Sequence, residues 1–242
     1  MFKEIIYAEV TVDTGLAPVI ENVVADAKPR RKPPSAGSRV VLIANTHKVV
    51  IRVAELTGRD RRLSPATKWR LVQDNFPIGA FLNADTHIFD GSVFKNSEGE
   101  HRFMMAALSK AIAEPMGEMA AEKWKVSKLL RLDTIEHMLF RQFANEGHKW
   151  VVFPQSEGFR ILHINNSLPQ GANYISNHPE FRNLELERAW EANMPSSAII
   201  LSRTTGVKPD TPDLPEERGD YWIRDFLQGR GVGVSHEDLS FK

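Results

Sequence analysis

Cysteine is absent from the 242 residues, and so are a charge excess of one sign and any long apolar run. Without thiols the chain can form no disulfide, thiol nucleophile or cysteine-ligated metal site, which suits a reducing compartment. Its 31 basic residues balance 31 acidic ones, so no overall field steers it to nucleic acid or lipid. No run reaches the roughly 18 apolar residues that span a bilayer. We therefore expect a cytoplasmic protein that a partner would have to hold at a membrane.

Sequence motifs of several common catalytic sites are missing as well. The chain contains no G-x-G-x-x-G loop, no G-x-x-x-x-G-K-[ST] loop and no G-x-S-x-G element. Its eight histidines are scattered, with no H-x-x-x-H or H-E-x-x-H spacing, which predicts no zinc site. The glycine-rich segment 229–233 follows a predicted helix, which is the wrong order for a dinucleotide loop. It predicts a helix stop and a turn.

Strands and helices alternate through the first half of the chain. A turn at residues 45–48 lies between two β-branched runs and predicts that they form a hairpin. Asp133 is expected to cap a helix, with Glu136 three residues later in capping-box spacing. The predicted strands cover residues 3–12, 39–44, 49–56, 103–109 and 128–132. The predicted helices cover residues 64–75, 111–125 and the segment after Asp133.

The second half has a more legible pattern. Two short turns, at 155–158 and 166–171, join three apolar strands into a meander. The predicted elements are strands at 150–153, 159–165 and 172–176, a helix at 178–193, a strand at 197–202, a helix at 220–228 and a strand at 232–234. This β-β-β-α-β-α-β order can also be traced in the first half. The pattern predicts an α/β protein of two lobes, residues 1–146 and 147–242.

Five segments carry a resemblance to known proteins: the strand pair at 40–56, the Asn75-Phe76-Pro77 turn, the strand and Lys at 102–110, the strand and helix start at 128–135, and the meander at 150–176. With these segments, the two-lobed pattern resembles the actin-like, ribonuclease-H-type superfamily of sugar kinases, heat-shock ATPases and actins. Within it, the chain looks most similar to the PilM-type actin-like proteins of type IV pilus assembly and to the cytoplasmic domain of the type II secretion L protein. The resemblance implies a duplicated actin-like fold with an abbreviated second lobe.

Nucleotide binding in this superfamily uses two hairpins whose backbone N–H groups hold phosphates. The resemblance places the second hairpin at Gln155, Ser156 and Gly158, where the family's Asp is missing and Pro154 removes one N–H donor. Asp13 and Gly15 form the chain's only Asp-x-Gly in the first lobe. That motif is either a surviving phosphate hairpin or a plain turn, and no second carboxylate in similar context supports an aspartic-protease motif. We expect no catalytic residue, no metal and no required cofactor, with weak binding of ATP and Mg²⁺ left open.

The resemblance also implies a partner, because the family's anchored partner offers a short extended tail. The candidate groove for such a tail consists of Phe81, Ile88, Phe89 and Phe94, unless another part of the same chain covers these side chains. The expected function is a non-catalytic scaffold or adaptor of a type IV pilus or type II secretion machine. It would lie in the cytoplasm, peripheral to the inner membrane through a PilN-like partner, and could form homo-oligomers. The alternative is a nucleotide-dependent enzyme of the same superfamily, such as a small kinase or ATPase.

Overall fold

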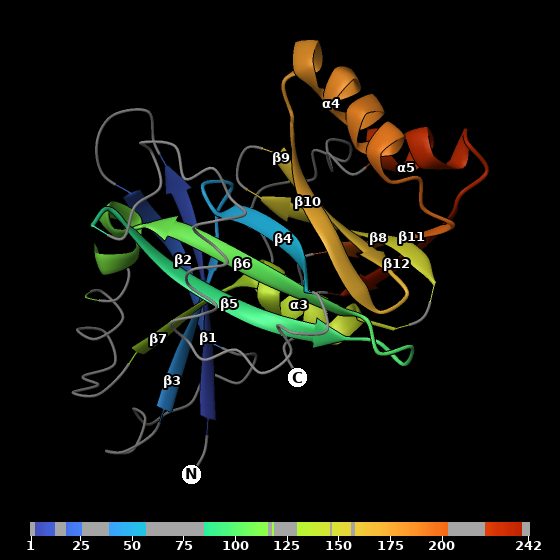
Figure 1. Cartoon of the computed structure of the whole chain (residues 1–242). Helices are drawn as coiled ribbons and strands as arrows, with labels where there is room; N and C mark the ends of the chain where they lie inside the picture. The colour runs from blue at the N-terminus through green and yellow to red at the C-terminus, as the bar shows by residue number, and fades with distance from the viewer. Residues whose placement is uncertain are drawn as a thin grey trace.

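The computed structural model contains three β-sheets and a set of helices that pack on them (Figure 1). We refer to the four-stranded sheet as sheet A, the three-stranded sheet as sheet B and the five-stranded sheet as sheet C. None of the helices among the described residues is long and apolar enough to cross a membrane. The structure describes residues 3–12, 18–25, 39–56, 85–115, 118, 130–145, 147–155, 158–202 and 221–238.

Sheet C contains the meander predicted for the second half, and the element order β-β-β-α-β-α-β is confirmed. Its strands lie in the order β10-β9-β8-β11-β12, with β8 antiparallel to β9 and parallel to β11. Helices α4 and α5 lie together on one side of this sheet, at the upper right of Figure 1. The elements are β8 (His148–Gln155), β9 (Gly158–Asn165), β10 (Leu168–Ser176), α4 (Pro179–Ala192), β11 (Ser197–Ser202), α5 (Tyr221–Gln228) and β12 (Gly233–Asp238).

The turn between β9 and β10 is shorter than predicted. It consists of Asn166 and Ser167, whose φ angles of 47° and 66° are the positive values that a two-residue type I′ hairpin needs. Strand β10 therefore starts at Leu168, and the turn predicted over 166–171 was wrong. Pro169 is tolerated inside the strand because β10 is an edge strand of sheet C.

Sheet A repeats most of the pattern of sheet C. Its order is β2-β1-β3-β7, with β1 antiparallel to β2 and parallel to β3, which in turn runs parallel to β7. The same directions occur in β9-β8-β11-β12, so the described part of sheet A lacks only a counterpart of β10. This internal repeat confirms a mixed sheet in each half. The strands are β1 (Lys3–Val12), β2 (Pro18–Ala25), β3 (Arg39–Asn45) and β7 (Leu130–Thr134).

Sheet B corrects the hairpin predicted around residues 45–48. Its antiparallel order is β4-β6-β5, so β4 pairs with β6, while β3 pairs with β1 and β7 in sheet A. The turn is real, because the Val49 N–H donates to the Thr46 carbonyl at 3.2 Å, but it carries the chain out of sheet A. Sheet B thus stands as an insertion between β3 and β7. Its strands are β4 (Val50–Leu56), β5 (His87–Lys95) and β6 (His101–Ser109).

Of two further helices predicted in the first half, one is described in part and the other lies outside the described residues. Residues 110–115 are helical, in agreement with the start of the helix predicted at 111–125. The helix predicted at 64–75 lies outside the described residues. The proposed lobe boundary at 146/147 stays a prediction.

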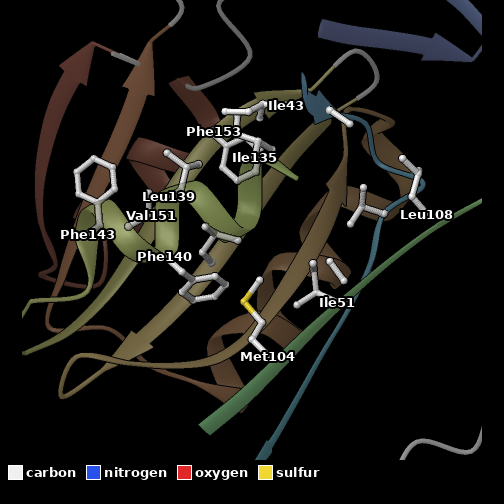
Figure 2. Packing of buried hydrophobic residues seen from close by; sticks show 14 of the residues in the cluster. Ile43, Ile51, Met104, Leu108, Ile135, Leu139, Phe140, Phe143, Val151 and Phe153 are labelled. Carbon is white, nitrogen blue, oxygen red and sulfur yellow. The ribbon is translucent and has the colours of Figure 1, made fainter. Parts of the chain in front are cut away.

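Helix α3 (Ile135–Phe143) lies at the centre of the molecule. Its buried side chains share one core with residues of β3, sheet B and the near face of sheet C, as Figure 2 shows. On β8, Val151 and Phe153 face this core, whereas Trp150 and Val152 face the helices α4 and α5, which is the alternation of a strand buried on both sides. The N-cap of α3 is Thr134, whose Oγ1 accepts from the His137 N–H at 3.4 Å. The cap predicted at Asp133 was wrong by one residue, because the helix begins at Ile135 and the residue directly before it is Thr134.

Candidate functional site: a buried polar contact between the lobes

The carboxyl ends of β3 and β8, one parallel strand from each lobe, are in contact. In α/β sheets this edge is where ligands bind. Strand β3 ends at Asn45, and β8 ends at Gln155. The Gln155 Nε2 donates to Asn45 Oδ1 at 2.9 Å, and the Asn45 Nδ2 donates to the Pro154 carbonyl at 3.2 Å. These bonds tie the start of the second lobe's hairpin to the first lobe.

Arg160 on β9 forms the second and larger part of this contact. Its Nε lies 3.2 Å from Glu136 Oε1 on α3, and the two side chains are only 6% and 0% exposed. Its Nη2 donates to the carbonyls of His47 at 3.1 Å and Val49 at 2.9 Å. One guanidinium therefore joins β9, α3 and the turn that leads into sheet B.

An aromatic side chain completes the surroundings of the guanidinium. The ring of Tyr174 on β10 lies 5.8 Å from the Arg160 Cζ, a cation–π distance. The same ring lies 5.2 Å from that of His47. The contact thus includes a side chain from β10 as well.

Burial opposes the charges of this ion pair. Desolvation raises the pKa of the Glu136 carboxyl above its ordinary value, and the positive charge of Arg160 only partly opposes that rise. Desolvation likewise lowers the pKa of the Arg160 guanidinium. A buried pair of this kind contributes little net stability, whereas loss of one partner leaves an uncompensated charge in the interior.

The hairpin residues predicted from the resemblance are only partly described. Gln155 is buried and bonded to Asn45. Gly158 packs against β10, where a Cβ would lie 2.1 Å from the Ile175 carbonyl oxygen. Ser156, Asp13 and Gly15 lie outside the described residues. Within the described ranges, no three His, Asp or Glu side chains gather to hold a metal ion.

Sequence reasoning missed Arg160 and its partners. A signal was present, because Arg160 is a charged residue inside the apolar run Phe159–Ile164. A strand that is buried on both faces can accommodate an arginine only if the charge is paired. The identity of the partner could not be read, since Glu136 approaches from a different element through the tertiary fold.

The residues of the predicted partner groove fall on two faces of sheet B. Ile88 and Phe94 pack on the central core, where the rings of Phe94 and Phe140 lie 6.1 Å apart. Phe89 points to the opposite face and packs with Val93 on a smaller buried cluster. This split follows from the two-residue period of a strand. Phe81 lies outside the described residues.

Comparisons with known proteins give a likeness of fold. No protein-family model matches the sequence, and no curated protein matches it. A chain of the PilM–PilN type IV pilus biogenesis complex matches with a TM-score of 0.50 and 11% identity, over 96% of this chain and 87% of that chain. Together with the repeated sheet order, this likeness shows that the protein has the actin-like fold predicted from the sequence. At the level of fold it is similar to the PilM–PilN complex.

Two further structures are similar at lower scores. One is a protein of unknown function with an actin-like ATPase fold from Bacteroides thetaiotaomicron, with a TM-score of 0.47, 12% identity, and coverage of 82% of this chain and 68% of that chain. The other is the cytoplasmic domain of EpsL, an inner membrane component of the type II secretion system of Vibrio cholerae. Its TM-score is 0.45, with 10% identity, over 98% of this chain and 90% of that chain.

Proposed function

We propose that the protein is a non-catalytic, actin-like scaffold of a type IV pilus or type II secretion machine, which binds a short segment of a membrane-anchored partner. The observation that carries this proposal is the bonded contact between the lobes. A nucleotide-binding site of this fold has to offer free backbone N–H groups to phosphates. At that edge the side chains of Gln155, Arg160 and Asn45 bond to protein groups, which supports a structural role for the contact.

The proposed partner is a PilN-like protein of the inner membrane, by analogy with the complex whose fold this chain shares. The chain itself would stay in the cytoplasm and be recruited by that partner. Strand β5 offers a suitable surface, because among the described strands it pairs only with β6 and forms one edge of sheet B. An edge strand can accept an extended segment through its backbone, with neighbouring side chains setting specificity. Phe89 and Val93, both half-buried, are the apolar side chains of this edge on the face opposite the central core.

The partner is tested by purifying the tagged full chain from the membrane fraction of its own cells. We expect a single-span membrane protein with a short cytoplasmic tail to co-purify. A synthetic peptide of that tail should then bind the purified chain in calorimetry. Phe89→Ala should weaken peptide binding at least tenfold while changing the melting temperature little, because its side chain is only partly buried.

Ile88→Ala is the matched control, since Ile88 lies next to Phe89 but packs on the central core. It should lower the melting temperature without a selective loss of peptide binding. If both variants bind the peptide as the wild type does, the surface at β5 is not the docking site.

The non-catalytic part of the proposal is tested with ATP and Mg²⁺. A ligand at about 100 times its dissociation constant stabilises a protein by roughly 2.7 kcal/mol, which thermal unfolding detects. We expect no such rise and no phosphate release. A rise without phosphate release would indicate weak nucleotide binding only, whereas a rise with steady release would overturn the proposal in favour of a nucleotide-dependent enzyme.

A further inference from the structure

None of the described strands of sheet B pairs with sheet A or sheet C, so side-chain contacts contribute to its orientation. Its inner face rests on the central core through residues such as Ile51, Met104 and Leu108 (Figure 2). Apolar contact of this kind is non-directional and depends mainly on the area removed from water. The apolar contact holds sheet B against α3, but it restricts the angle between the sheet and the helix only weakly.

Among the described residues, two arginines donate hydrogen bonds to sheet B or to the turn before it. Arg141 on α3 donates to Ser92 Oγ on β5 at 2.9 Å, at the exposed surface. Arg160 donates in the interior to the carbonyls of His47 and Val49, the residues that lead into β4. Buried hydrogen bonds from a charged donor are stronger and more geometrically demanding than exposed ones. The buried hydrogen bonds of Arg160 therefore restrict the orientation of sheet B more than the exposed bond of Arg141 does.

We propose that Arg160 is a positioning residue: acting from the second lobe, it fixes the angle at which sheet B leaves the first lobe. Glu136 forms an ion pair with the Nε side of the guanidinium, while Nη2 donates to the two carbonyls. Nε and Nη2 lie on one rigid plane, so the ion pair and the two carbonyls keep fixed relative directions, whereas a lysine ammonium is a compact charge on a flexible stem. The inference goes beyond the proposed function, because it concerns the free chain without any partner.

The role of this pair is orientation rather than stability. Replacing a buried ion pair by uncharged side chains of similar volume is often neutral or stabilising. The double variant Glu136→Gln/Arg160→Met should therefore keep its urea midpoint close to that of the wild type. It should nevertheless lose the bonds to the turn before β4, and with them the fixed angle of sheet B.

The absence of cysteine makes a direct measurement possible. Spin labels are attached to cysteines introduced at Glu98 and Met194, which are exposed in sheet B's β5–β6 turn and before β11. Pulsed electron resonance then reports the distance between sheet B and the second lobe. The wild-type background should give one narrow distance, and the double variant a distribution at least twice as wide. Leu227→Ala, a cavity in the α5 core, is the control that lowers the urea midpoint while keeping the distance narrow.

A narrow, unchanged distance in the folded double variant would overturn the inference, and would leave the peptide-binding test of the proposed function untouched. If the double variant does not fold, Arg160→Lys decides the question. This variant keeps the charge opposite Glu136 but loses the fork. A widened distance would support the positioning role, and a narrow one would overturn it.

Discussion

Gly158 and Ile175 lie on paired strands so close together that no larger residue fits at the glycine. A Cβ on Gly158 would lie 2.1 Å from the Ile175 carbonyl oxygen and 2.8 Å from the Tyr174 hydroxyl. The closer obstacle is backbone, which cannot move aside as a flexible side chain could. The glycine predicted from the resemblance as part of a phosphate hairpin thus has a packing role in this fold.

We expect Gly158→Ala to lower the free energy of unfolding by about 3 kcal/mol or more, because β9 and β10 must separate to admit the methyl group. Gly233→Ala is the control, since a Cβ at Gly233 meets nothing within 4 Å. That change should stay within about 0.5 kcal/mol of the wild type. Urea unfolding of both variants measures the difference. Equal stability of the two would show that the β9–β10 contact relaxes freely.

Removing one member of the Arg160–Glu136 pair should be far more costly than removing both charges. Arg160→Met leaves the Glu136 carboxylate buried without its partner, and we expect a loss of about 3–5 kcal/mol. Adding Glu136→Gln to that variant should restore most of the loss. A chemical denaturation series on the wild type and the three variants gives the coupling energy. Additive effects of the two single changes would argue against a coupled pair.

The imidazole of His163 should make stability depend on pH. Burial lowers the pKa of His163 to about 4, and its Nε2 lies 2.6 Å from Asn173 Oδ1. The unfolded chain takes up this proton near pH 6.5, whereas the folded chain does so only near pH 4. The free energy of unfolding should therefore fall as pH drops from 6.5 to 4, on the order of 3 kcal/mol from this group.

The pH effect is measured as a difference between proteins, since carboxyl groups titrate in the same range. His163→Asn should show a shallower fall between pH 6.5 and 4 than the wild type. His178→Asn, which changes an exposed histidine at the start of α4, is the control substitution. Parallel curves for the wild type and His163→Asn would contradict the prediction.

Arg230 should stabilise the packing of α5 on α4. Its Cζ lies 3.7 Å from the centroid of the Phe226 ring and 5.4 Å from that of Trp190, and it forms an ion pair with Glu187. We expect Arg230→Ala to lower the free energy of unfolding by about 1 kcal/mol. Arg230→Met keeps the apolar stem and should recover part of that loss, as thermal unfolding can show. Full recovery in the methionine variant would mean that the charge contributes nothing.

The second lobe could be predicted from the sequence because its contacts are local. Short turns join β8, β9 and β10, so neighbours in the chain are neighbours in the sheet. In the first lobe the same reasoning gave a wrong strand pairing after Asn45. A short turn there suggested a hairpin, but β4 finds its partner in β6, which follows a long intervening segment. The residue types of a turn predict that the chain changes direction there. They do not predict which strand the next segment pairs with.

The candidate site shows the same limit. Gln155 and Gly158 were identified because a family pattern points to the hairpin between β8 and β9. The partners that give the site its character, Asn45 and Glu136, come from β3 and α3. Nothing in the sequence around these two residues marks them as partners. The tertiary fold alone brings Asn45 to Gln155 and Glu136 to Arg160. Periodicity and spacing within the sequence cannot predict such long-range pairs.

The insertion of sheet B between β3 and β7 has a consequence for synthesis on the ribosome. Strand β3 needs β7 beside it, yet the whole of sheet B must be translated between the two. At the usual pace of translation, the open edge of β3 would wait on the order of ten seconds for its neighbour. An open strand edge recruits other chains. The nascent first half is therefore the part of this protein that most needs a chaperone, whereas the later meander, with its local pairing, can fold as soon as it emerges.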